Sequence, residues 1–203
     1  MTIPKIKQKD TMSNENTESP PETDPRPGEL RTPESLLIVN TGHGKGKSTA
    51  AFGIMIRGVA RGWKVGVVQF VKSGDWNVGE EKIGIQLGVD WITLGEGFSW
   101  DSANLDKDKQ TGANAWAKAH DLLMGGEYDL LIFDELTYPL NWNWIETQPV
   151  LDALVGRPSH VHVVVTGRDA PQSLIDIADT VSEVQNIKHA YQKGFKAKRG
   201  IDF

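Results

Sequence analysis

Residues 39–53 read VNTGHGKGKSTAAFG, a glycine-rich stretch that constrains the fold more than any other part of the chain. Its central part, TGHGKGKST, is preceded by SLLIVN and followed by AAFGIMIRGVARG, so the region reads as strand, glycine-rich turn and helix. Glycines let successive backbone N–H groups point into one concavity, and the N-terminus of the helix adds positive potential there. The stretch therefore predicts a phosphate-binding loop held between a strand and a helix.

The residues of this loop have distinct expected roles. Lys47 is expected to reach the outer phosphates as a catalytic group, and the hydroxyl of Ser48, or of the adjacent Thr49, to ligate Mg²⁺. The common pattern G-x-x-x-x-G-K-[ST] would place its first glycine at position 41, where this chain has Thr41 and then Gly42. His43 is expected to line the phosphates rather than act as a catalyst. The residues expected to bind the nucleotide are Thr41, Gly42, His43, Gly44, Lys45, Gly46, Lys47, Ser48 and Thr49.

Short β-branched runs alternate with helical patterns from residue 35 onward. Near-continuous apolar runs are typical of strands buried on both faces of a parallel sheet. Their alternation with helices favours an α/β fold with right-handed crossovers. We expect a mostly parallel sheet with helices on both faces, of the P-loop NTPase (RecA-like) type. The predicted strands are 35–40, 64–71, 89–94, 128–135 and 160–167, and the predicted helices are Lys47–Arg61, Val78–Leu87, Lys107–Met124 and Pro171–Ala178.

The first 34 residues differ in composition from the rest. They contain six of the ten prolines, seven acidic residues and no aromatic residue. Such a segment cannot bury enough apolar surface to offset the entropy of ordering. We therefore expect a disordered tail over 1–34 and one P-loop α/β domain over 35–203. The final stretch, NIKHAYQKGFKAKRGIDF, is polar enough to be a surface segment that lies over a site.

Composition limits the functional classes. The chain has no cysteine, which excludes disulfides, thiolate metal sites and cysteine nucleophiles and fits a reducing cytoplasm. Its formal net charge of −5 gives no general electrostatic reason to bind nucleic acid or an anionic membrane. The sequence shows neither an apolar run long enough to span a bilayer nor the apolar stretch of a secretion signal. We expect a cytoplasmic protein with no nucleic-acid or membrane partner.

Two other predicted strands end in groups suited to a nucleotide. YDLLIFDE ends in Asp134 and Glu135, and carboxylates at such a strand end hold Mg²⁺ directly or through water in many phosphate-loop proteins. VVVTGRDAP presents Arg168 where an open α/β sheet places its ligands. Arg57, in the helix after the phosphate loop, is a further candidate for cofactor binding. The two carboxylates also leave open a hydrolase in which Glu135 activates water.

The stretch LGEGFSWD, residues 94–101, places Phe98 and Trp100 on a glycine-containing loop. Bulky aromatic side chains are poor choices for a loop surface unless they pack on something. They either fill the edge of the core or cover a large planar ligand.

Taken together, these motifs resemble one family, the P-loop-type corrinoid (cob(I)alamin) adenosyltransferases. The resemblance runs over residues 36–203. It rests on TGHGKGKSTAAFG, VGVVQFVK, GEGFSW, DELTY, VVVTGRDAPQSLIDIADTVSEV and IKHAYQKGFKAKRGIDF, which occur in that order. Each motif alone is a weak indicator of the family, but six motifs in the same order are highly specific for it.

The resemblance implies that the 5′-deoxyadenosyl group of ATP passes to the Co(I) of a corrinoid, which is cobalamin or a precursor, with release of triphosphate. The bond cut is then ribose carbon to oxygen, and ATP is bound in the reverse sense to most P-loop proteins. Cob(I)alamin is itself a strong nucleophile, so the protein has to hold carbon and cobalt close and in line. It also has to stabilise the charge of the departing triphosphate.

The resemblance also implies roles and partners. Phe98 and Trp100 pack under the corrin and displace its lower axial ligand, which makes reduction of Co(II) to Co(I) easier. The protein is implied to be a homodimer that uses Mg²⁺ and a flavin-type or other electron donor. His43 departs from the asparagine that is more frequent in the family, and DSAN after Trp100 departs from Glu-Thr-Gln. Trp142 and Trp144 are core, interface or corrin-facing residues, and core or interface is favoured.

Two other functions remain compatible with the residues. A P-loop ATPase or kinase that cleaves a phosphate bond would use Lys47, Ser48 and the two carboxylates equally well. An ATPase or kinase function would not explain the aromatic loop or the basic C-terminal stretch. A non-catalytic regulator or corrinoid carrier would bind ATP or cobalamin without turnover.

Overall fold

The computed structural model describes residues 28–71, 78–94 and 105–202. The chain divides into two units, Met1–Thr32 and Pro33–Phe203. All the helices and strands described below lie in the second unit.

A six-stranded sheet forms the centre of this unit, and all of its strands are parallel. The strand order is β3-β2-β4-β5-β1-β6. Because the strands are parallel, their carboxyl ends meet along one edge of the sheet, and this edge carries the phosphate loop. The strands are β1 (Leu37–Thr41), β2 (Val65–Gln69), β3 (Asp90–Thr93), β4 (Leu130–Asp134), β5 (His162–Thr166) and β6 (Thr180–Glu183).

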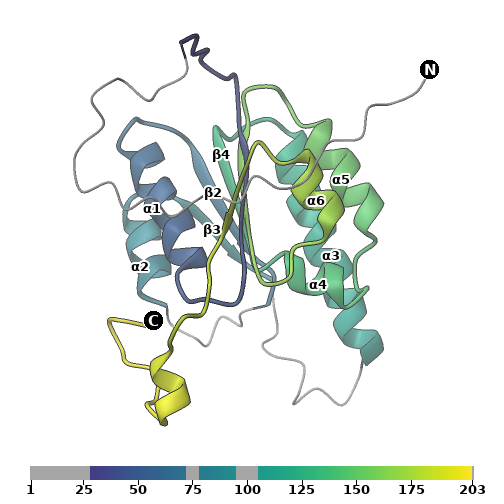
Figure 1. Ribbon diagram of the computed structural model, residues 1–203. Helices are drawn as coiled ribbons and strands as arrows, with labels where there is room; N and C mark the ends of the chain where they lie inside the picture. The colour runs from purple at the N-terminus through teal and green to yellow at the C-terminus, as the bar shows by residue number, and fades with distance from the viewer. Residues whose placement is uncertain (1–27, 72–77, 95–104, 203) are drawn as a thin grey trace. The chain divides into compact units, whose positions relative to one another are not determined.

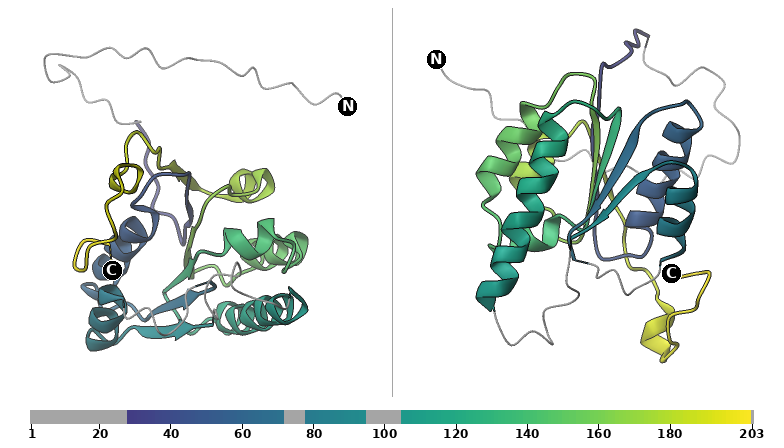
Figure 2. Two further views of the ribbon diagram at one scale, coloured as in Figure 1. Left: turned by 90° about the horizontal axis from the view of Figure 1, so that it is seen from below. Right: turned by 180° about the vertical axis from the view of Figure 1, so that it is seen from behind.

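Helices cover both faces of the sheet (Figure 1). Two helices lie on one face, α1 (Lys47–Val59) and α2 (Gly79–Gln86). Four lie on the other, α3 (Leu105–Met124), α4 (Thr137–Asn141), α5 (Thr147–Val155) and α6 (Gln172–Ile177). The two layers are also visible from below and from behind in Figure 2. A 3₁₀ turn, η3 (Ala190–Lys193), lies in the C-terminal segment.

The alternation of side chains along each strand divides the core into two clusters. In β4, Leu130 and Ile132 belong to the cluster with Phe52 and Met55 of α1. Leu131 and Phe133 belong to the larger cluster on the other face. All five residues of β4 are buried, as a parallel strand covered on both faces requires.

The predicted α/β class, a parallel sheet with helices on both faces, is confirmed. The five predicted strands and four predicted helices all form, with ends shifted by a few residues. The elements α4, α5 and β6 were not predicted from the sequence. All four residues of β6 are exposed, so the strand lacks the apolar run by which the others were predicted, and it forms because the edge of β1 offers backbone partners.

Among the described helices, none combines the length and hydropathy that crossing a bilayer would require.

Candidate active site

A cavity of about 480 Å³ opens at the carboxyl edge of the sheet, beside the phosphate loop. This volume lies in the range typical of small-molecule sites. The structure brings together here most of the residues predicted for nucleotide binding. The predicted residues that line the cavity are His43, Gly44, Lys45, Gly46, Lys47, Ser48, Thr49, Glu135 and Arg168.

The glycines of the loop serve two different purposes. A Cβ atom at Gly42 would lie 2.6 Å from the carbonyl oxygen of Val184, and one at Gly44 would lie 2.5 Å from that of Gln185. These two glycines are therefore required because the chain after β6 packs directly on the loop. Gly46 has a φ of +124°, and a Cβ atom there would meet no neighbour within 4 Å, so its backbone faces open space just before α1 begins.

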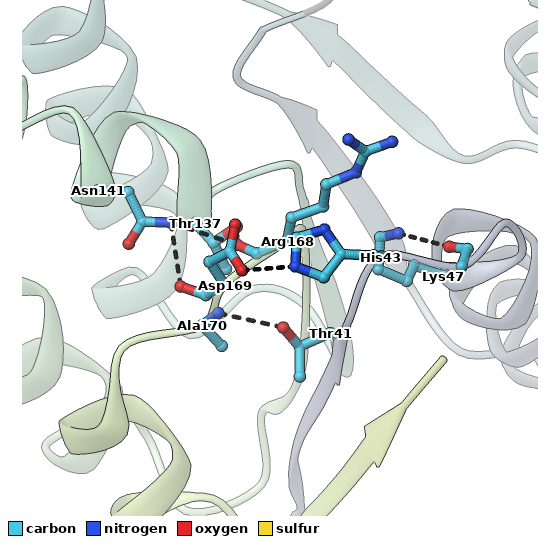
Figure 3. Close-up of polar contacts among 9 residues, drawn as sticks. Thr41, His43, Lys47, Thr137, Asn141, Arg168, Asp169 and Ala170 are labelled. Atoms are coloured by element: carbon cyan, nitrogen blue, oxygen red, sulfur yellow. Dashed lines mark hydrogen bonds and ion pairs between the residues drawn. The ribbon is translucent and has the colours of Figure 1, made fainter. Parts of the chain in front are cut away.

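Lys47 is the first residue of α1, and its side chain folds back over the loop. Its Nζ donates a hydrogen bond of 2.7 Å to the carbonyl oxygen of Gly44 (Figure 3). Burial lowers the pKa of Lys47, and the positive charge of Arg168 lowers it further, while Glu135 and other nearby carboxylates oppose the shift. Lys47 and Arg168 thus place two positively charged side chains on one cavity, and such a site suits an anion.

Thr41 and Gly42 do not line the cavity, although both were predicted to bind the nucleotide. The Oγ1 of Thr41 instead accepts a hydrogen bond of 3.1 Å from the amide of Ala170 (Figure 3). The neighbouring Asn40 donates from Nδ2 to the carbonyl oxygen of Lys47 at 3.3 Å. The end of β1 therefore holds the loop and the segment after β5 in place.

Asp134 is fully buried below the cavity and does not line it. Its Oδ2 accepts a hydrogen bond from Gln69 at 3.0 Å, and its Oδ1 accepts one from Thr166 at 2.7 Å. Gln69 in turn accepts from the indole of Trp91 at 3.0 Å. The carboxylate thus joins a polar network that runs across the ends of β3, β2, β4 and β5. That it also holds Mg²⁺, directly or through water, stays a prediction.

Glu135, the next residue, does line the cavity. Its φ is +66°, a left-handed conformation that is unusual for a side chain of this kind. Its backbone amide donates to Oγ1 of Thr166 at 3.0 Å, so the same buried network fixes this turn of the chain. Backbone strain of this type is concentrated at functional sites, where the surrounding structure maintains it.

Thr166 is therefore the residue whose hydroxyl links Asp134 to the turn at Glu135. We expect Thr166→Val to lower the free energy of unfolding by about 1–3 kcal/mol, because it leaves a buried carboxylate oxygen and a backbone amide without this partner. Urea denaturation followed by circular dichroism measures the change. Thr166→Ser keeps the hydroxyl and should cost clearly less; equal losses in the two variants would contradict the role of the network.

Arg168 enters the cavity from the turn after β5. Its carbonyl oxygen accepts hydrogen bonds from Thr137 at 2.6 Å and from Asn141 at 3.3 Å, which attach this turn to α4. The following Asp169, with a φ of +51°, lies 3.0 Å from Nε2 of His43 (Figure 3). His43 therefore connects the phosphate loop with the β5–α6 turn at the exposed rim of the cavity.

The C-terminal segment forms a further wall of the cavity, as its polarity predicted. Its cavity-lining residues are Asn186, His189, Tyr191, Gln192 and Asp202. Nδ1 of His189 accepts from the amide of Tyr191 at 3.1 Å and so begins the 3₁₀ turn η3. The amide of Gly44 also donates to the carbonyl oxygen of Val184 at 2.6 Å, which ties this segment to the loop.

Besides Thr41, Gly42 and Asp134, one more of the described residues predicted for the site, Arg57, does not line this cavity. Arg57 is in the last turn of α1 and lines a different pocket together with Trp63 and His162. Phe98 and Trp100 lie outside the described residues.

The tryptophans of the region after β4 form an aromatic row. Trp142 contacts Tyr138, with ring centroids 5.3 Å apart, and Trp144, at 4.7 Å. Trp142 and Tyr138 pack on the larger core cluster, in agreement with the favoured core assignment for Trp142. Tyr138 also lines the cavity, and burial, followed by the charge of Glu135, raises the pKa of its hydroxyl.

Sequence reasoning missed several residues of the cavity wall. Glu80 belongs to no motif and reaches the cavity only because α2 packs beside it. Tyr138 ends the motif DELTY, but that motif predicted no separate role for its side chain. Asp202 lies in the C-terminal motif, but that motif predicted no separate role for its carboxylate. Gln69 ends an apolar strand, and its polarity in a buried position was the one signal from which its role in the network could have been found.

Comparison with known proteins shows which family has a similar sequence. Residues 33–203 match the model of the family described as ATP:corrinoid adenosyltransferase BtuR/CobO/CobP. The corrinoid adenosyltransferase of Escherichia coli K12 is 39% identical over 180 residues, which are 89% of this chain and 91% of that protein. Corrinoid adenosyltransferase CobA of Salmonella typhimurium is 39% identical, with the same shares covered. Among solved structures, the flagellar accessory protein FlaH of Methanocaldococcus jannaschii is 12% identical with a TM-score of 0.49, over 74% of this chain and 71% of that one. The family match over almost the whole second unit, together with the phosphate loop and the cavity beside it, shows that the chain belongs to the ATP:corrinoid adenosyltransferase family.

Proposed function

We propose that this protein transfers the 5′-deoxyadenosyl group of ATP to the Co(I) centre of a corrinoid. The electron pair of Co(I) attacks the 5′ carbon, the cobalt–carbon bond forms, and the bond between that carbon and the 5′ oxygen breaks. The triphosphate leaves with the electron pair of the broken bond. The side chains of the protein bind and orient the two substrates and stabilise the leaving group.

The observation that carries this proposal is that this chain, which belongs to the family, has a cavity suited to bind an anion. Lys47 and Arg168 line one cavity with the backbone of Gly46 and the N-terminus of α1. Backbone amides and the helix dipole stabilise phosphate oxygens, and the two cations neutralise the charge that develops on the triphosphate. We assign Lys47 to the leaving group and the loop residues that line the cavity, with Arg168, to ATP.

The residues present also suit Mg²⁺. The Ser48 hydroxyl and the Glu135 carboxylate line the same cavity and are oxygen ligands of the kind that Mg²⁺ prefers. Mg²⁺ bound there would neutralise part of the charge of the triphosphate. We assign Ser48 and Glu135 as its ligands, with Asp134 holding the turn that presents Glu135.

The remaining assignments rest on the family resemblance. Phe98 and Trp100 pack under the corrin and displace its lower axial ligand, and a flavin-type or other electron donor supplies Co(I). The protein acts as a homodimer in the cytoplasm.

Product analysis tests the proposal against cleavage of a phosphate bond. The protein is incubated anaerobically with ATP, Mg²⁺ and chemically reduced cobalamin, and the cobalt–carbon product is followed by its spectrum. We expect one triphosphate for each adenosylated corrinoid. Accumulation of ADP with orthophosphate would instead identify an ATPase, and ADP without orthophosphate would identify a kinase. Binding of both substrates without a product would identify a carrier or regulator.

A further inference from the structure

The phosphate loop already contacts an anion that belongs to the chain itself. Nζ of Lys45 lies 2.7 Å from Oδ1 of Asp202, and both residues line the cavity beside Lys47. Oδ2 of Asp202 accepts a hydrogen bond of 2.6 Å from the amide of Lys198. Both oxygens of the carboxylate are therefore bound, and one of them holds a lysine of the loop.

The segment that carries Asp202 packs little of its apolar surface. Four large apolar side chains in it are more than half exposed, and they are Ile187 at 85%, Tyr191 at 77%, Phe195 at 62% and Ile201 at 75%. A segment with so few buried contacts opens at a small fraction of the free energy needed to unfold the core. Asp202 can therefore leave Lys45 without disturbing the sheet.

A carboxylate and a phosphate compete for the same kind of partner. Both are oxyanions that accept charge-assisted hydrogen bonds from an ammonium group, and a triphosphate carries more charge than a carboxylate. Lys45 lies between Gly44 and Gly46, whose backbone lines the cavity, so its ammonium group serves either anion from the same loop. Two anions that contact the same ammonium group repel each other, so Asp202 and a phosphate oxygen each weaken the other's interaction with Lys45.

We propose that Asp202 is an internal competitor of the triphosphate for Lys45. It holds Lys45 when no phosphate is bound, gives way when ATP enters, and takes Lys45 back as the product triphosphate leaves. Asp202 thus limits how tightly the triphosphate is retained and assists its release. This inference rests on the proposed function because it takes the triphosphate as the anion.

The test measures binding of inorganic triphosphate with Mg²⁺ to the full chain by calorimetry, and its dissociation rate by stopped flow. We expect Asp202→Asn to bind triphosphate about two- to five-fold more tightly, the range that an exposed ion pair supports, and to release it more slowly. The matched control is Glu127→Gln. It removes one negative charge and an exposed ion pair of 2.9 Å with Lys64, which precedes β2 at the opposite edge of the sheet, and should leave the affinity unchanged.

A double-mutant cycle assigns the effect to Lys45. In a Lys45→Gln background, Asp202→Asn should no longer change the affinity. Weaker or unchanged binding in Asp202→Asn overturns the inference, as does tighter binding that persists without Lys45. If the unmodified protein binds ATP productively but its affinity for triphosphate does not respond to Asp202, only this inference fails. If it does not bind triphosphate at all, the leaving-group site of the proposed function fails with it.

Discussion

Replacing Lys47 with alanine is expected to lower kcat/KM for adenosyl transfer by about 10²–10³-fold, the loss typical when one group that stabilises a developing negative charge is removed. Lys47 begins α1, lines the cavity and folds over the loop onto the Gly44 carbonyl oxygen. Its ammonium group has to exchange this carbonyl for the oxygens of the triphosphate. The charge of those oxygens rises as the carbon–oxygen bond breaks, so the loss should appear mainly in kcat.

The measurement is the initial rate of cobalt–carbon bond formation with prereduced corrinoid, at several ATP concentrations. Lys118→Ala, on the exposed surface of α3, is the matched control and should keep full activity. Circular dichroism and urea denaturation establish that the Lys47 variant is folded. Full activity in a folded Lys47→Ala protein would contradict the role of this residue at the leaving group.

Replacing Gly167 with alanine is expected to lower the free energy of unfolding by about 2–4 kcal/mol. Gly167 has a φ of +143°, which side-chain-bearing residues rarely adopt, and its Cβ atom would overlap Oγ1 of Thr137. Thr137 is fully buried and donates to the carbonyl oxygen of Arg168, so it cannot move aside without loss of that bond. The substitution therefore strains the backbone and the packing of α4 on the turn that carries Arg168.

Two further variants separate these contributions. Gly88→Ala also has a positive φ, of +82°, but meets no neighbour, so it should show only the backbone cost of roughly 1–2 kcal/mol. In a Thr137→Ala background, Gly167→Ala should cost less than in the unmodified chain, because the overlapping hydroxyl is gone. Urea denaturation gives all these values. Equal costs at positions 88 and 167 would show that contact with Thr137 is unimportant.

The strands and helices predicted from the sequence were those with a strong local signal. Apolar runs such as YDLLIFDE predicted buried strands because burial on both faces of a parallel sheet demands them. β6 has no such run, and it exists only because the edge of β1 supplies hydrogen-bond partners. Its formation also places Val184 against the loop, which explains why Gly42 and Gly44 have to be glycine.

In the candidate site, too, some features were predicted from local motifs and others became visible only in the structure. The loop residues and Arg168 were predicted because their motifs lie at strand ends, which a parallel sheet brings to one edge. The sequence did not predict that the side chains of Asp134 and Thr41 form hydrogen bonds with Thr166 and with the Ala170 amide. Which oxygen faces the cavity depends on the path of the chain after each strand.

The sequence by itself determined the phosphate loop, the parallel α/β class and the family, because each is encoded in residues close together in the chain. Only the tertiary structure decided that Asp134 supports Glu135 from below the cavity and that Asp202 reaches Lys45. These pairings join segments whose contacts depend on the packing of the whole unit, and Lys45 and Asp202 stand near opposite ends of it in the sequence. No local pattern of residues carries such information, because the hydrogen bonds form only after the sheet has brought the segments together.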